Sequence, residues 1–305
     1  MNELLLPYNH IPNILLLGNG INRAFNQISW CDLLSKVKCR VFSLDEEKAL
    51  EKVPYPLRAV IYSNDTVDQC AKKLSSDLCA FTPPREETEL LSELLNIPFD
   101  AILTTNYSYE IEKTLYPDFH ISPGKRNKFR KTSCVESNIQ KKNHLHRYFL
   151  LKDSKQNQHQ IWHIHGEAAL SSTMIIGHYY YGYLLSRLQS YSGNFMARYK
   201  ASLRSQNGYI CHSWMDYIML GNIYVVGLGM DFSEMDLWWL VNCKKRNCDN
   251  LSKIELYKPD ASPELRMLAD AYGVKINDTV PFKFDFILYY SNVIKHLKST
   301  VTSIL

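Results

Sequence analysis

Four short stretches of the chain carry glycine, hydroxyl, amide and imidazole groups in arrangements that suit a nucleotide-binding site. They are "LLLGNG" at 15–20, "LTTN" at 103–106, "WHIHG" at 162–166 and "VVGLGMD" at 225–231. A glycine turn after an apolar run lets a phosphate approach the backbone, and the N-terminus of the next helix favours negative charge. The amide of Asn106 can hold a hydroxyl group or a water molecule. The imidazole of His165, with an ordinary pKa of about 6.5, suits a general base.

Each of these stretches also has a simpler structural interpretation. The turn at 18–20 could be only a tight bend, because Arg23 stands where a dinucleotide-binding fingerprint has its third glycine. Asn106 could cap the following helix, and His165 could be a core residue at the end of a strand. Arg23 itself could face a phosphate or simply lie on the surface of the first helix. All four stretches follow apolar runs. This favours one common site over four unrelated structural roles.

The elements that must position these residues alternate along the chain. Short apolar runs predict strands, and amphipathic stretches between them predict helices, with Ser233 as the N-cap of one of them. The expected strands are 13–18, 99–106, 160–166, 221–229 and 253–258, and the expected helices are 65–81, 84–96, 107–116, 233–246 and 262–272. Alternation of this kind is typical of an α/β fold with a Rossmann-like parallel sheet and helices on both faces. The carboxyl ends of such strands meet at one edge of the sheet, where ligands bind.

The remaining segments predict how this sheet is elaborated within a single domain, 1–305. The polar, basic region from about 117 to 158 breaks the alternation and indicates an irregular insertion, and the tyrosine-rich region 179–218 indicates a small helical cap. The net charge is only +4, from 35 basic and 31 acidic residues. That balance does not favour direct nucleic-acid binding, and the basic stretch 124–147 is typical of a solvated loop.

The eight cysteines are scattered and form no Cys-x-x-Cys pair. This spacing favours reduced thiols over a disulfide framework or a zinc module, so we expect no metal. The N-terminal residues carry no basic leader, and no apolar run approaches the ~20 residues of a membrane span. We therefore expect an intracellular, cytoplasmic protein with no membrane partner.

Taken together, these motifs resemble the sirtuin fold family, and its sirtuin-like bacterial branch more closely than its protein deacylases. The resemblance covers about residues 12–110 and 160–260. It implies that the residues of the first turn hold the pyrophosphate of NAD, that the Thr-Thr-Asn segment lines the nicotinamide-ribose pocket, and that the His-Gly pair supplies the catalytic histidine. It also implies that the later glycine turn touches a phosphate or the adenosine ribose. The residues so assigned are Gly18, Asn19, Gly20 and Asn22; Thr104, Thr105 and the catalytic Asn106; the catalytic His165, before Gly166; and Gly227, Leu228 and Gly229, to which we add Asp231.

Three departures distinguish this chain from the deacylases of that family. It lacks their two Cys-x-x-Cys pairs, it has Ser108 where their Thr-Gln-Asn-x-Asp motif ends in an acid, and its first loop is Gly-Asn-Gly instead of Gly-Ala-Gly. The resemblance therefore implies an NAD-consuming effector of anti-phage, abortive-infection defence. The resemblance also implies that this chain forms a homo-oligomer, or acts with a separately encoded sensor or ATPase subunit, and that this assembly gates its activity.

The reaction that fits is hydrolysis of NAD, as substrate, to nicotinamide and ADP-ribose. Asn106 would hold the ribose hydroxyls or the attacking water, and His165 would act as the base. Two alternatives stay open. A Rossmann-type dehydrogenase could use Asp45, in "CRVFSLDEE", to bind the adenosine ribose. A non-catalytic sensor subunit could bind NAD or ADP-ribose without turnover.

Overall fold

The computed structural model describes residues 4–27, 29–64, 67–124, 135–137, 145–206, 208–248 and 252–302. Within this part of the chain, eight strands form one sheet in the order β10-β9-β8-β2-β3-β6-β5-β4. Every neighbouring pair from β10 to β6 is parallel, whereas β5 and β4 each run antiparallel to the preceding strand in that order. The bounds are β2 Asn13–Leu17, β3 Ala101–Thr104, β4 Val135–Ser137, β5 Phe149–Lys152, β6 Gln158–His163, β8 Asn222–Val226, β9 Ile254–Tyr257 and β10 Val274–Ile276.

The order of the parallel strands defines where a ligand can bind. Numbered along the chain, β2, β3, β6, β8, β9 and β10 lie in the order 3-2-1-4-5-6, which is the doubly wound dinucleotide-binding order. The direction of winding reverses between β2 and β8, so the crevice of such a sheet opens at the carboxyl ends of these two strands. The expected α/β fold with a mostly parallel, Rossmann-like sheet is therefore confirmed.

The register brings the ends of three strands to the same level. Leu17 of β2 pairs with Thr104 of β3 on one side and with Val226 of β8 on the other. The next residues, Gly18, Thr105 and Gly227, therefore leave the sheet side by side. The four strands predicted to carry the functional stretches are β2, β3, β6 and β8, and they are neighbours in the sheet.

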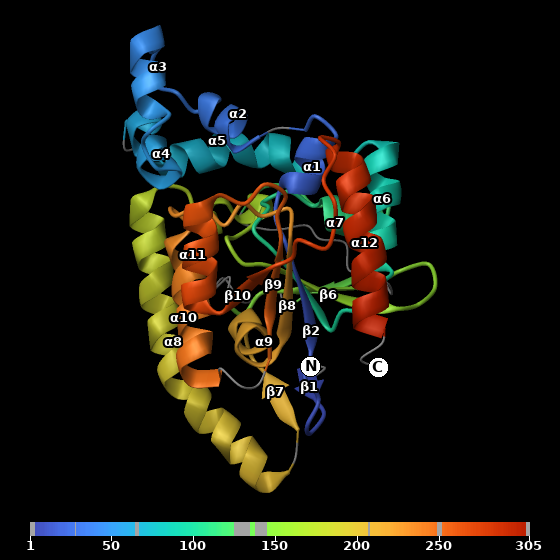
Figure 1. Cartoon of the computed structure of the whole chain (residues 1–305). Coiled ribbons are helices and arrows are strands. Elements are labelled where there is room, and N and C mark those ends of the chain that lie inside the picture. Colours follow the sequence, from blue (N-terminus) through green and yellow to red (C-terminus); the bar gives the residue numbers. More distant parts are fainter. Residues whose placement is uncertain are drawn as a thin grey trace.

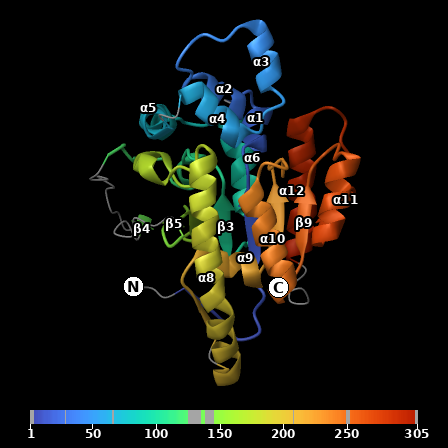
Figure 2. The ribbon, with the colours of Figure 1, turned by 90° about the vertical axis from the view of Figure 1, so that its left-hand side faces the viewer.

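Helices cover both faces of the sheet, because successive strand residues point to opposite sides. Leu15 and Leu17 lie in one core cluster with residues of α1, α6, α7 and α12, while Ile14 and Leu16 lie in the other with residues of α8 to α11. Figures 1 and 2 show these two layers on either side of the strands. The bounds are α1 Gly20–Ala24, α6 Arg85–Leu95, α7 Glu110–Leu115, α8 His178–Ser205, α9 Trp214–Leu220, α10 Met235–Cys248, α11 Pro263–Tyr272 and α12 Phe286–Thr302.

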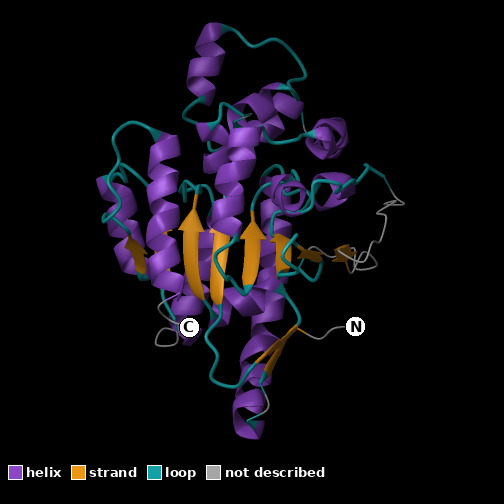
Figure 3. Cartoon of the chain, turned by 90° about the vertical axis from the view of Figure 1, so that its right-hand side faces the viewer, coloured by secondary structure: helices purple, strands orange, loops and turns teal. Residues whose placement is uncertain are grey.

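A further group of helices lies over the carboxyl edge of the sheet. These are α2 (Trp30–Ser35), α3 (Leu44–Leu50), α4 (Tyr55–Ser63) and α5 (Val67–Ala80). Figure 3 shows the arrowheads of the strands pointing toward them. The short helix η1 (Ala168–Thr173), which follows β6, packs against α5. This group forms the cover of the crevice.

The two segments expected to elaborate the sheet have distinct positions. In the region 117–158, β4 and β5 extend one edge of the sheet, and most of the basic stretch 124–147 lies outside the described residues. The region 179–218 contains most of α8, the strand β7 (Tyr209–Cys211), which pairs with β1 (Leu4–Leu6), and part of α9. The 28-residue helix α8 runs beside α10 along one face of the sheet.

The structure contradicts the predicted helix cap at Ser233 and the strand that the dehydrogenase alternative requires before Asp45. Helix α10 begins at Met235, and the hydroxyl of Ser233 donates to Asp231 Oδ1 over 2.7 Å instead of capping the helix. The segment "CRVFSLDEE" contains no strand, because Ser43 caps helix α3 and Asp45 lies in the first turn of that helix. The acid at position 45 is therefore not at the end of a second parallel strand, where a dehydrogenase would need it.

Candidate functional site

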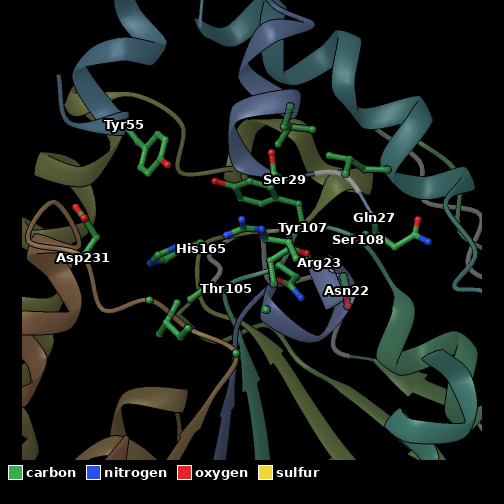
Figure 4. A pocket seen from close by; sticks show the side chains of 18 of the residues that line it. Asn22, Arg23, Gln27, Ser29, Tyr55, Thr105, Tyr107, Ser108, His165 and Asp231 are labelled. Atoms are coloured by element: carbon green, nitrogen blue, oxygen red, sulfur yellow. Dashed lines mark hydrogen bonds between the residues drawn. The ribbon is translucent and has the colours of Figure 1, made fainter. Parts of the chain in front are cut away.

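One cavity of about 470 Å³ opens at the carboxyl ends of β2 and β8, beneath the cover. Ten of the twelve residues predicted for the site line it: Asn19, Gly20, Asn22, Thr105, Asn106, His165, Gly227, Leu228, Gly229 and Asp231. Figure 4 shows the labelled side chains around this hollow, with His165 and Asp231 at the left of the view and Gln27 at the right. The other two predicted residues, Gly18 and Thr104, lie behind this lining. The sequence motifs therefore converge in space.

The two glycine turns pack tightly against each other. The Gly20 amide donates to the Gly227 carbonyl over 2.7 Å, and Gly18 donates to Val226 over 2.9 Å. A Cβ atom at Gly20 would lie 2.3 Å from Tyr290 Oη and 2.6 Å from the Gly227 Cα atom. Only Gly227 among these three glycines has a positive φ, of 67°. Close packing of two chain segments thus already requires glycine at 18 and 20, and the Gly20 N–H is not free for a phosphate.

Two asparagines stabilise the first turn from within. Asn22, in α1, donates its side-chain amide to Asn19 Oδ1 over 2.9 Å and is 4 % exposed. Both residues also line the cavity. This contact keeps the turn and the start of α1 in one arrangement at the floor of the crevice.

Thr104 supports the site without lining it. Its hydroxyl donates to the Leu17 carbonyl over 3.0 Å and accepts the Asn106 amide N–H over 3.1 Å. The hydroxyl thus joins β2 to the loop after β3. The prediction that Thr104 touches a ligand is not supported by this geometry, because its side chain is fully buried.

The side chain of Asn106 is held by a carboxylate that sequence reasoning missed. Asn106 Nδ2 donates to Glu110 Oε1 over 2.5 Å, and Ser108 Oγ donates to Glu110 Oε2 over 2.7 Å. Glu110 is fully buried at the start of α7. The acid that the sequence lacks at position 108 is therefore present four residues after Asn106, at the first position of α7. The contact depends on the fold of the loop 105–109, so no local pattern in the sequence indicated it.

His165 is paired with a second buried carboxylate, to which the sequence analysis assigned no role. His165 Nε2 lies 2.8 Å from Asp236 Oδ2, and Asp236 is fully buried in α10. Burial would lower the pKa of His165, but the charge and the hydrogen bond of Asp236 outweigh it, so the pKa is raised above its usual value. The pKa of His165 thus lies above the ordinary histidine value from which the sequence analysis started. The ring also packs edge-on against Tyr181 at 5.7 Å.

Gly166 is required for the position of His165. Its φ is 86°, and a Cβ atom there would lie 1.9 Å from the Thr173 carbonyl oxygen. The chain therefore turns sharply after the histidine, and the His165 carbonyl accepts from Ile175 over 2.9 Å. The His-Gly pair is thus a structural unit that anchors the end of this loop.

Charged side chains of both signs line the cavity. Arg23 and Lys258 line it together with Asp231 and Glu234. Burial lowers the pKa of the Lys258 ammonium, and Arg23 adds to this effect while Asp231 opposes it. Neither cation has an ion-pair partner within the described ranges. These two cations could interact with the phosphates of a dinucleotide, and Lys258 was not predicted from the sequence.

Two acidic side chains, those of Glu234 and Asp236, lie close to His165. Burial raises the pKa of Glu234 to about 7, while the charge of His165 opposes this rise and that of Asp236 adds to it. One ligand atom from each of His165, Glu234 and Asp236 lies within 4.8 Å of the others, a donor set that a divalent cation can accept. His165 Nε2 and Asp236 Oδ2 are hydrogen-bonded to each other.

A second histidine lies one layer below the cavity. His163 Nδ1 donates to the Asn106 carbonyl over 2.7 Å, and its Nε2 lies 2.8 Å from Glu112 Oε1. Burial opposes protonation, but Glu112 raises the pKa of His163 to about 9. The imidazolium thus holds the backbone of Asn106 from beneath. Of the two histidines in "WHIHG", only His165 lines the cavity.

No protein-family model matches this chain. A comparison with curated proteins gives no match either. The functional assignment therefore rests on the geometry of the site. None of the helices in the described ranges is both long and apolar enough to cross a membrane.

Proposed function

We propose that the chain hydrolyses the nicotinamide–ribose bond of NAD and acts as a sirtuin-like, NAD-depleting effector of anti-phage defence. One observation carries the proposal: Asn106 and His165, which follow the strands β3 and β6, line the same cavity as both glycine turns. This cavity lies at the switch point of a doubly wound sheet, which is the dinucleotide position in such folds. The resemblance of the motifs to the sirtuin family supports the choice of reaction.

In the proposed reaction, the C1′–N bond breaks and its electron pair leaves with nicotinamide, which becomes neutral. A water oxygen forms the new bond to C1′, and its proton passes to the neutral imidazole of His165. Asp236 stabilises the imidazolium that results, because it accepts a hydrogen bond from Nε2. The proton then returns to solvent. The two cations that line the cavity, Arg23 and Lys258, interact with the diphosphate.

The dehydrogenase alternative loses its main support. Asp45, its candidate for the adenosine ribose, lies on α3 and does not line the cavity. We also propose that NAD cleavage is gated by oligomerisation or by a separately encoded sensor or ATPase subunit, because unregulated NAD loss would harm the host cell.

Incubation with NAD tests the proposal. We expect free nicotinamide and ADP-ribose in equal amounts, without an acylated peptide or an added metal, in at least one oligomeric state or with the partner subunit. NADH formation from NAD and a reduced substrate would instead indicate a dehydrogenase. Binding of NAD without nicotinamide release in every assembly state would indicate a sensor, and either result would overturn the proposal.

A further inference from the structure

Asn106 has four polar groups, and three of them are engaged by buried partners. Its amide N–H donates to Thr104 Oγ1, its carbonyl accepts from His163, and its side-chain Nδ2 donates to Glu110. Within the described part of the chain, only Oδ1 has no hydrogen-bond partner. Asn106 lines the cavity, so this oxygen is the group that it offers to a ligand.

The orientation of the Asn106 amide follows from the chemistry of Glu110. A carboxylate is only an acceptor, so it must face the NH₂ group of Asn106 and not the oxygen. Ser108 Oγ donates to the second carboxylate oxygen, so both oxygens of Glu110 act as acceptors. Glu110 is fully buried. If Glu110 did not accept from it, the Asn106 amide or the Ser108 hydroxyl would be a buried donor without a hydrogen bond, which destabilises the folded protein. A flipped amide would place two oxygens 2.5 Å apart.

We propose that Glu110 is a positioning residue that holds Asn106 Oδ1 toward the cavity and makes Asn106 a hydrogen-bond acceptor for an O–H group. The groups that it would receive are a ribose hydroxyl or the attacking water, whereas a phosphate or carbonyl oxygen would be repelled. This inference rests on the proposed NAD hydrolysis for its catalytic consequence. The orientation itself is independent of any substrate.

A direct test of the orientation uses the free protein labelled with ¹⁵N at asparagine. The side-chain NH₂ signal of Asn106 is identified by its absence in Asn106→Ala. We expect slow solvent exchange and a downfield proton shift, because the group is buried and donates to a carboxylate. Glu110→Gln should move this signal. Glu87→Gln, a matched change at a neighbouring fully buried carboxyl that makes no hydrogen bond among the described residues, should leave it in place.

A kinetic test asks whether Glu110 acts through Asn106. We expect Glu110→Leu to lower kcat by about 100-fold with KM changed less than about twofold, because a misplaced amide affects the reaction more than binding. The shape-conserving Glu110→Gln should retain activity within about 10-fold, since its amide oxygen can still accept from Asn106. In an Asn106→Ala background, Glu110→Leu should cause no further loss.

The outcomes separate this inference from the proposed function. An Asn106 NH₂ signal that is unchanged in Glu110→Gln overturns the inference, whether or not the protein cleaves NAD. Additive losses in the double variant overturn it as well, because they indicate a merely structural role. If Glu110→Leu does not fold, the NH₂ signal of Asn106 in labelled Glu110→Gln still tests the inference. A protein that releases no nicotinamide overturns the proposed function and leaves the NH₂ result intact.

Discussion

His165 is subject to two opposing effects, burial and the negative charge of Asp236. The carboxylate prevails, so the imidazole keeps its proton to a higher pH than a free histidine does. A base that must accept a proton works only after it has lost its own. The pairing therefore makes catalysis depend on pH in a direction that can be stated in advance.

The first prediction concerns this pH dependence. We expect kcat/KM for NAD to rise with pH and to level off, with a midpoint above the ordinary histidine pKa of about 6.5. Asp236→Asn removes the charge that raises the pKa of His165, so the midpoint should move to lower pH and the plateau should fall. The measurement is kcat/KM from about pH 5 to pH 9. A midpoint that is the same in both proteins would show that another group controls the rate.

The second prediction concerns the two proposed catalytic side chains. Asn106→Ala and His165→Gln should each lower kcat by at least about 100-fold, or about 2.7 kcal/mol of barrier. Glutamine is preferred at 165 because its amide can still donate to Asp236, whereas alanine would leave a buried carboxylate unpaired. Circular dichroism and melting temperature serve as the control for folding. Near-normal rates in both folded variants would show that the site has been wrongly assigned.

At the scale of elements, the turns after β2 and β8 contain one glycine that is needed for packing and one that faces the cavity. Substitutions at these two glycines can therefore distinguish an effect on folding from an effect on ligand binding. A side chain at Gly20 would collide with Tyr290 and with the backbone of Gly227. A Cβ atom at Gly229, which lines the same cavity, would meet only Lys258 Nζ at 3.9 Å, which is an ordinary contact. The two glycines therefore form a matched pair for a test.

The third prediction uses this pair. Gly20→Val should lower the free energy of unfolding by about 1–3 kcal/mol or more, as overpacking in a well-packed region does. Gly229→Val should keep the melting temperature of the wild type and weaken NAD binding by about 10-fold, or about 1.4 kcal/mol, because its methyl groups enter the cavity. Thermal melting and calorimetric titration measure both quantities. Unchanged NAD affinity in Gly229→Val would mean that the dinucleotide does not approach this turn.

The elements that could be predicted from sequence are those whose apolar pattern is local. The runs before Gly18, Thr105 and Gly227 are short and continuous, so β2, β3 and β8 were expected correctly. Helices α2 to α4 were missed, because the segment 30–63 has little regular apolar spacing and is stabilised by capping residues such as Ser29 and Ser43. Such capping contacts contribute only about 1 kcal/mol each, which makes them weak signals in a single sequence.

The fourth prediction concerns the packing of α6 on α7. Burial, with the nearby charge of Glu110, raises the pKa of Glu87 in α6 to about 8, from 4.5. Between these values the folded protein keeps a proton that the unfolded chain has lost, so stability falls as pH rises from 4.5 to about 8. Glu87→Gln removes this loss and should raise the melting temperature near pH 8.5, with little effect near pH 4.5. Equal effects at both pH values would exclude titration of Glu87 as the cause.

At the scale of the whole molecule, the site is assembled from segments far apart in the sequence. Asn106 and Glu110 come from the first half of the chain, whereas His165, Asp236 and Lys258 come from the second. The motif residues could be predicted because each follows a strand whose end must reach one edge. Asp236 and Lys258 could not be assigned roles, because these depend on which strands and helices become neighbours. The order of the strands arises when the sheet assembles, and the residues of a single motif do not indicate it.

The fifth prediction follows from this assembly. A dinucleotide in the crevice would touch α1, the turn before α10 and the cover at Asp77 and Leu78, all of which line the cavity. We expect ADP-ribose, the product, to slow amide hydrogen exchange in three separate regions: 18–27, 225–236 and 74–81. At about 100 times its Kd the ligand should also add about 2.7 kcal/mol to the free energy of unfolding, because it binds only the folded chain. The amides of α11, which is outside the cavity lining, serve as the internal control.

Protection confined to one of the three regions would indicate a ligand held by a single turn. In that case the two halves of the sheet and the cover would not act as one binding site, and hydrolysis would lack the enclosed position that His165 and Asn106 need to share.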